Sequence, residues 1–150
     1  METMTQEDKE LLLNDLCARL PYGVMLSITH NEYTNETFNA RISAIDYCGE
    51  IKVRYGFEEY EQVFSLEQIK PYLFPLSSMT DEQKEELKCE ISKQTEILIE
   101  RMKNDDCGID CGKYHFHSLL ELEWCIKNHF DYRGLIPKDL AIDATGLNIY

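Results

Sequence analysis

The hydrophobic pattern of residues 24–64 repeats every second residue, and this constrains the fold more than any other feature of the chain. The alternating apolar positions fall in four short stretches, 24–28, 38–44, 51–55 and 60–64. Alternation of this kind is typical of strands with one buried face. Polar or glycine-containing turns separate the stretches. We therefore expect an antiparallel meander, either an open sheet of four or five strands or a small SH3-like barrel.

A helical pattern precedes the predicted sheet. Leu13, Leu16, Cys17 and Leu20 repeat at helical spacing and should form the buried stripe of this helix. Thr5 is a good N-cap residue, because its hydroxyl can accept a hydrogen bond from a free backbone N–H. Pro21 cannot donate such a bond, so the helix should end before it.

Two further helices are predicted in the second half of the chain. Thr80 and Gln83 have capping-box spacing, and a long stretch with a narrow apolar stripe follows them. Ser118 and Glu121 have the same spacing and predict the start of the second helix. Trp124 lies in an apolar part of that helix, so we expect it to be buried.

The predicted fold class is therefore α+β. It comprises an N-terminal helix, the antiparallel sheet or small barrel, then two helices and an irregular C-terminal tail. Residues 65–79 are expected to be an extended connector, because Pro71 and Pro75 disfavour helix around them. The predicted division is a helix-plus-sheet unit over 1–79 and a helical region over 80–150 packed on it, with a single domain of 1–150 as the alternative.

The charge balance limits the classes of partner. The chain has 28 acidic and 15 basic residues, a formal net charge of −13. Duplex nucleic acid and anionic membranes are bound mainly through Lys and Arg, so neither is an expected partner. The first residues, METMTQEDKE, lack the basic start and apolar core of a signal peptide. We expect a cytoplasmic protein whose six cysteines are mostly reduced thiols.

Four candidate metal ligands occur close together in CGIDCGKYHFH, residues 107–117. They are Cys107, Cys111, His115 and His117. Thiolate and imidazole are the usual zinc ligands, but structural zinc sites favour a C-x2-C pair and a distant second pair. The spacing instead favours a loop that leads into the helix at Ser118. We therefore predict no metal or other cofactor.

Catalytic motifs are equally sparse. The segment HFDYRG places His129, Asp131, Tyr132 and Arg133 together, and these side chains can act as acid, base or anion clamp. Neighbouring residues seldom face one site, so a structural turn with Arg133 paired to a carboxylate is the preferred interpretation. The sequence contains no P-loop, no dinucleotide-binding glycine pattern and no nucleophile elbow. No catalytic or cofactor-binding residue is therefore assigned.

Three stretches carry a resemblance. LLLNDLCARLPYG (11–23), IKPYLFPLSSMT (69–80) and NHFDYRGLIPKDLAIDA (128–144) are similar to segments of a group of small uncharacterised proteins encoded by gut-bacterial phages and mobile elements. The resemblance implies an accessory protein that acts in a bacterial cytoplasm. It assigns no role to any residue.

The favoured function is a non-enzymatic accessory or protein-interaction protein with an acidic surface and an unidentified protein partner. The first alternative is a nucleic-acid-associated small-barrel module, because small barrels often serve that purpose. The second is a metal-dependent or hydrolytic enzyme, which a deep pocket joining His129 or His115 to a carboxylate would favour.

Overall fold

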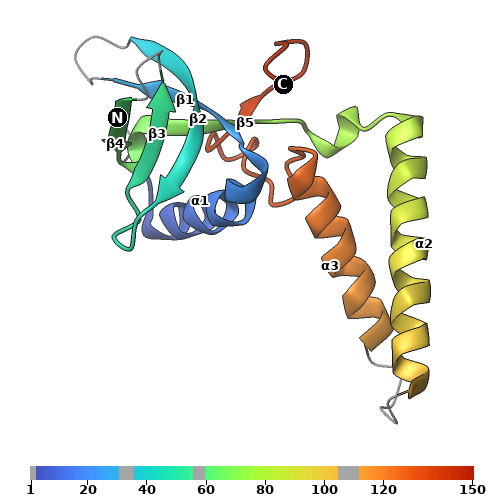
Figure 1. Cartoon of the computed structure of the whole chain (residues 1–150). Helices are drawn as coiled ribbons and strands as arrows, with labels where there is room; N and C mark the ends of the chain where they lie inside the picture. The colour runs from blue at the N-terminus through green and yellow to red at the C-terminus, as the bar shows by residue number, and fades with distance from the viewer. Residues whose placement is uncertain (1–2, 31–35, 56–59, 105–111) are drawn as a thin grey trace.

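An N-terminal helix, a six-stranded sheet and a protruding pair of helices make up this α+β protein (Figure 1). The computed structural model describes residues 3–30, 36–55, 60–104 and 112–150; the side chains of 55, 60, 101–104 and 112–117 are outside this description. The elements are α1 (Gln6–Arg19), the 3-10 turn η1 (Leu20–Tyr22), β1 (Met25–Thr29), β2 (Thr37–Ile45), β3 (Ile51–Tyr55), β4 (Tyr60–Phe64), η2 (Leu66–Gln68), β5 (Ile69–Leu73), η3 (Leu76–Ser78), α2 (Asp81–Asn104), α3 (Gly112–Lys127) and β6 (Ile142–Asp143).

The sheet is open. Its strand order is β4-β3-β2-β1-β5-β6, and the first five strands pair antiparallel. The short β6 pairs parallel with β5, through Tyr72 with Ile142 and Leu73 with Asp143. A barrel requires the two edge strands to pair, and in the described part of the chain β4 and β6 do not. The barrel alternative is therefore wrong, and a sixth strand lies in the tail that was expected to be irregular.

Strand β5 occupies the segment that the sequence predicted as an extended connector. It lies between β1 and β6, with Leu26 of β1 opposite Pro71. Prolines are rare in central strands because they cannot donate to the ladder. Strand β6 pairs only with Tyr72 and Leu73, so it does not extend alongside Pro71. This short pairing explains how a proline-containing segment can lie inside the sheet.

Helix α1 begins as predicted, but it buries a different face. The backbone N–H of Asp8 donates to the Thr5 hydroxyl across 3.2 Å, which confirms the N-cap. Leu16 is buried together with Leu12, Asp15 and Arg19. Cys17, which the predicted stripe included, is exposed. The leucine pattern misplaced the buried face because Asp15 and Arg19 neutralise each other and can therefore face the core.

One apolar cluster joins α1, the sheet and the C-terminal tail. Its buried members are Leu12, Leu16, Val24, Leu26, Ile28, Ala40, Ile42, Ile51, Val53, Phe64, Ile69, Leu73, Leu135, Leu140 and Ala141. The alternating burial along β1 shows why a period of two predicted these strands correctly. The tail contributes three residues to this cluster, so the core draws on both sides of residue 79. A division of the chain into two domains at that residue stays a prediction.

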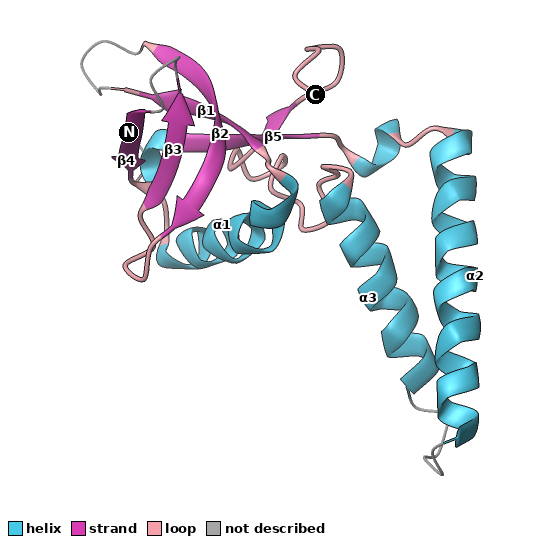
Figure 2. Cartoon of the chain, viewed as in Figure 1, coloured by secondary structure: helices cyan, strands magenta, loops and turns pink. Residues whose placement is uncertain are grey.

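Helices α2 and α3 form a hairpin that extends away from the sheet, and Figure 2 shows them approaching each other at the end farthest from it. The capping box at Thr80 is confirmed: Gln83 N–H donates to the Thr80 hydroxyl (3.2 Å), and Thr80 N–H donates to Gln83 Oε1 (2.9 Å). Helix α3 starts at Gly112, so the predicted cap at Ser118 is wrong. Within the described residues, neither helix is long and apolar enough to cross a membrane.

Candidate functional site

A groove of about 300 Å³ lies between α2 and α3, where the two helices diverge toward the sheet. We call it the interhelix groove. Its lining residues are Glu86, Glu90 and Gln94 from α2, Leu120, Glu123, Trp124 and Lys127 from α3, and Asn128 just after α3. The volume is at the lower limit for a small-molecule pocket, so it fits one or two protein side chains better than a cofactor.

The spacing of the lining residues explains the shape of the groove. Glu86, Glu90 and Gln94 are four residues apart, so they form one row along α2. Leu120 and Trp124 form a matching row along α3. The row on α2 covers about two helical turns, roughly 12 Å, and the row on α3 covers about one turn, roughly 6 Å. The groove is therefore an elongated channel parallel to the helices.

The groove has an apolar base. Trp124 is only 6% exposed, which confirms the prediction that it is buried, and its ring stacks on Phe130 with centroids 5.7 Å apart. Phe74, Met79 and Leu87 pack around this pair. Sequence reasoning assigned Trp124 to the core but missed that it also lines a groove. The half-buried Leu120, one turn away, was the available signal.

Acidic side chains dominate the rim. Glu86, Glu90 and Glu123 face one cation, Lys127, which gives the lining a formal charge of −2. None of these four groups forms an ion pair within the part of the chain that the structure describes. The Gln94 amide donates to Glu90 across 3.2 Å, which fixes one carboxylate beside the groove. Glu86, at the end of the acidic run 81–86, belongs to this rim.

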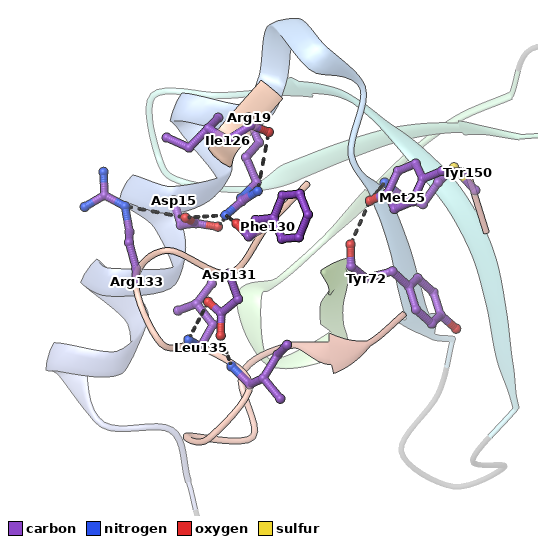
Figure 3. A network of polar contacts seen from close by, with 11 residues as sticks. Asp15, Arg19, Met25, Tyr72, Ile126, Phe130, Asp131, Arg133, Leu135 and Tyr150 are labelled. Atoms are coloured by element: carbon purple, nitrogen blue, oxygen red, sulfur yellow. Dashed lines mark hydrogen bonds and ion pairs between the residues drawn. The ribbon is translucent and has the colours of Figure 1, made fainter. Parts of the chain in front are cut away.

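The base of the hairpin is held by a buried arginine (Figure 3). Arg19 is fully buried and donates to both carboxylate oxygens of Asp15, at 2.6 and 3.2 Å. Its remaining donors reach the carbonyls of Ile126 (3.5 Å) and Phe130 (2.7 Å), at and just after the end of α3. A guanidinium has five donors in a fixed plane, so one residue can connect α1 to α3. The pair was not predicted from the sequence, although its i, i+4 spacing is a visible signal.

The HFDYRG residues lie around this arginine without converging on one reactive centre. Arg133 Nε is 3.4 Å from Asp15 in an ion pair that lacks hydrogen-bond geometry, which confirms the predicted carboxylate partner. Asp131 accepts from the backbone N–H groups of Leu135 (2.8 Å) and Ile136 (2.9 Å) and so fixes the following turn. Tyr132 is partly exposed.

His129 of the same segment stacks on Tyr150 with centroids 3.8 Å apart. The Tyr150 hydroxyl accepts from Met25 N–H and donates to the Tyr72 carbonyl, as Figure 3 shows. Burial is the main cause that raises the Tyr150 pKa to about 12. Burial, with smaller contributions from Arg19 and Arg41, lowers the His129 pKa to about 4. His129 is therefore neutral near pH 7, and no carboxylate hydrogen-bonds to its Nδ1 among the described residues.

The predicted metal-ligand candidates lie largely outside the described structure. Cys107 and Cys111 are in the undescribed segment 105–111, as are the side chains of His115 and His117. The backbone at both histidines is helical, so the expectation that the loop extends to residue 117 is wrong. The described residues contain no cluster of three or more His, Cys, Asp or Glu side chains suited to a metal.

No family model, curated protein or solved structure matches this chain. The choice of the interhelix groove as the candidate site therefore depends on the geometry of this chain alone. The interhelix groove combines a cavity, an aromatic base and charged side chains without ion-pair partners among the described residues.

Proposed function

We propose that this chain is a non-enzymatic accessory protein of a phage or mobile element, and that it acts in the bacterial cytoplasm by presenting the α2–α3 hairpin to a partner protein. The resemblance of three sequence stretches supports the setting. The observation that carries the interaction is the interhelix groove, with its apolar base and unpaired acidic rim on a protruding pair of helices.

Exposed apolar side chains on the hairpin add to this argument. Leu119 on α3 is 61% exposed and Ile97 on α2 is 45% exposed. A protein interface combines an apolar centre with a polar rim, and the hairpin offers both. The buried contacts of Arg19 fix the end of α3, so the groove is held in place before a partner arrives. Such preorganisation lowers the entropic cost of binding.

The two alternative functions receive less support. The small barrel that suggested nucleic-acid binding is replaced by an open sheet, and the groove is acidic rather than basic. The enzyme alternative asked for a pocket that joins a histidine to a carboxylate. The groove has no histidine among its lining residues, and His129 stacks on Tyr150 instead.

Position-specific photo-crosslinking in bacterial cells carrying the element tests the proposal. A photoreactive benzophenone amino acid replaces Leu119 on the hairpin or, as the matched control, the exposed Val63 on strand β4. We expect one dominant adduct at position 119 and none at position 63. Absence of an adduct at 119, or the same adducts at both positions, would contradict a hairpin-mediated interaction.

A further inference from the structure

We infer that the interhelix groove binds a basic segment of the partner protein, with an arginine or lysine of that segment placed between Glu90 and Glu123. This inference rests on the proposed function and names the chemistry of the partner. The apolar base and the charge of the groove each constrain the occupant, and they point to the same kind of side chain.

The order of residues along the groove locates the acidic centre. Helix α2 runs away from the sheet and α3 returns toward it. Glu86 and Lys127 therefore lie at the end near the sheet. Glu90 and Glu123 lie further along, one on each wall, and neither forms an ion pair with any residue in the described ranges. Two of the three carboxylates of the lining therefore lie in the middle of the groove.

Trp124 and Leu120 determine which cation suits this position. An arginine or lysine has an apolar stem that gains from contact with an aromatic or aliphatic surface, while its charged head needs a carboxylate. A guanidinium can also bind two carboxylates through separate N–H donors. The groove offers the apolar base and, above it, a carboxylate from each helix. A metal ion or a small anion would use only part of this arrangement.

The electrostatics oppose a second copy of this chain as occupant. Each chain has a net charge of −13, and the groove itself is acidic, so two copies would bring like charges together. A basic segment experiences the opposite effect and is drawn toward the groove. Charge complementarity therefore favours a basic segment of a partner protein over a second copy of this chain.

The single tryptophan provides the readout. Trp124 is the one tryptophan in the sequence and it lines the groove, so its fluorescence reports occupancy directly. The probe is a capped synthetic peptide of alanine, leucine and arginine, about 12–15 residues long, because a helix of about 18–22 Å extends beyond both ends of the roughly 12 Å row on α2. The control peptide carries neutral citrulline in place of every arginine. We expect a saturable change in Trp124 emission with the arginine peptide, weakened by salt, and none with the citrulline peptide.

Variants of the groove supply the decisive comparison. Glu90→Gln combined with Glu123→Gln should weaken peptide binding by about tenfold or more, because each substitution removes a charge-assisted contact to the peptide. Lys127→Gln should tighten binding, because it removes a repelling cation. The matched control, Glu7→Gln combined with Glu50→Gln, makes the same change in net charge away from the groove and should leave affinity within about twofold.

In the peptide assay, any of three results would overturn the inference: no emission change with the arginine peptide, equal binding of the citrulline peptide, or equal loss of affinity in the control variant. Analytical ultracentrifugation at increasing concentration tests whether a second copy of the chain occupies the groove. Dimerisation that is abolished by Glu90→Gln would also reject the inference of a basic partner segment. A position-specific adduct at Leu119 with no arginine-peptide binding would retain the proposed function and reject this partner chemistry. The two proposals are therefore separable.

Discussion

Arg19 on α1 donates a 2.7 Å hydrogen bond from Nη2 to the backbone carbonyl of Phe130, 111 residues further along the chain. The same guanidinium holds Asp15, and both side chains are fully buried. A buried ion pair is not a strong source of stability in itself, because desolvation offsets the attraction. Removal of one partner is costly, however, since it leaves the other charge buried and unpaired.

Arg19→Met should therefore destabilise the protein by about 3–5 kcal/mol, because Asp15 keeps only the more distant Arg133 and the carbonyls of Ile126 and Phe130 lose a donor. Urea unfolding followed by circular dichroism measures the change. The control is the double variant Asp15→Leu/Arg19→Met, which removes both charges and should lose less than the sum of the two single variants. A loss below about 1 kcal/mol in Arg19→Met would show that the pair does not anchor the hairpin.

Trp124→Ala should cost about 3–5 kcal/mol, because the side chain is 6% exposed and stacks on Phe130. Trp124→Phe keeps an aromatic ring in the cluster, so it should cost clearly less. Thermal or urea unfolding of both variants gives the comparison. Native emission at the wavelength of a fully solvated indole would contradict the burial of Trp124.

The imidazole of His129 should make stability depend on pH. Its pKa falls from about 6.5 in the unfolded chain to about 4 in the folded protein. Between these values the unfolded state binds more protons, so stability should decrease as pH falls from about 6.5 to 4 and this contribution should then level off. The ring is partly open to water, so the pKa shift contributes less than its full value to stability. We expect the free energy of unfolding to fall by about 1–2 kcal/mol over this pH range.

His129→Asn isolates this effect, because asparagine tolerates the left-handed backbone at this position, where φ is 64°. The variant should show a flatter decline of the urea midpoint between pH 6.5 and 4 than the parent protein. Carboxylates titrate in both proteins, so the difference between the two curves reports on the imidazole. Parallel curves would mean that folding does not lower the pKa of His129.

The thiols should differ in reactivity. Burial is the main cause that raises the Cys125 pKa to about 11, and Glu121 adds to it, whereas Cys17, Cys48 and Cys89 are exposed. The thiolate is the reacting form, so Cys125 should be alkylated by iodoacetamide at least tenfold more slowly at pH 8. Peptide mapping by mass spectrometry resolves each site. Similar rates at all four positions would contradict the packing around α3.

Chelation should leave stability unchanged, since the sequence spacing of Cys107, Cys111, His115 and His117 is poor for zinc. Thermal melts with and without a strong chelator should coincide, and untagged protein should contain no stoichiometric zinc. A fall of several degrees in the melting temperature, abolished by Cys107→Ser, would establish a metal site.

The features that sequence predicted correctly depend on local chemistry. Thr5 and Thr80 cap their helices through bonds to residues three positions away, and the alternation along 24–28 reflects one strand with one buried face. Each of these signals lies within a few residues, so no tertiary information was needed.

The features that sequence missed depend on distant partners. Arg19 faces the core because its acceptors lie at residues 126 and 130, and no local pattern reports such a contact. Strand β5 includes Pro71 because β6, some seventy residues later, is short. The interhelix groove could not be predicted because its shape depends on how α2 and α3 pack against each other. The prediction also placed the start of α3 at Ser118, six residues after its actual start at Gly112.

The length of the hairpin also has a mechanical consequence. Helix α3 has 16 residues, so its far end lies about 24 Å from the end that Arg19 contacts, whereas Glu123 lies only about 6 Å from that end. A rotation of about 10° around the contacts of Arg19 would move the far end by roughly 4 Å and Glu123 by roughly 1 Å. The hairpin is thus a lever whose pivot is the buried arginine. The groove lies near that pivot, where angular fluctuation displaces a bound segment least.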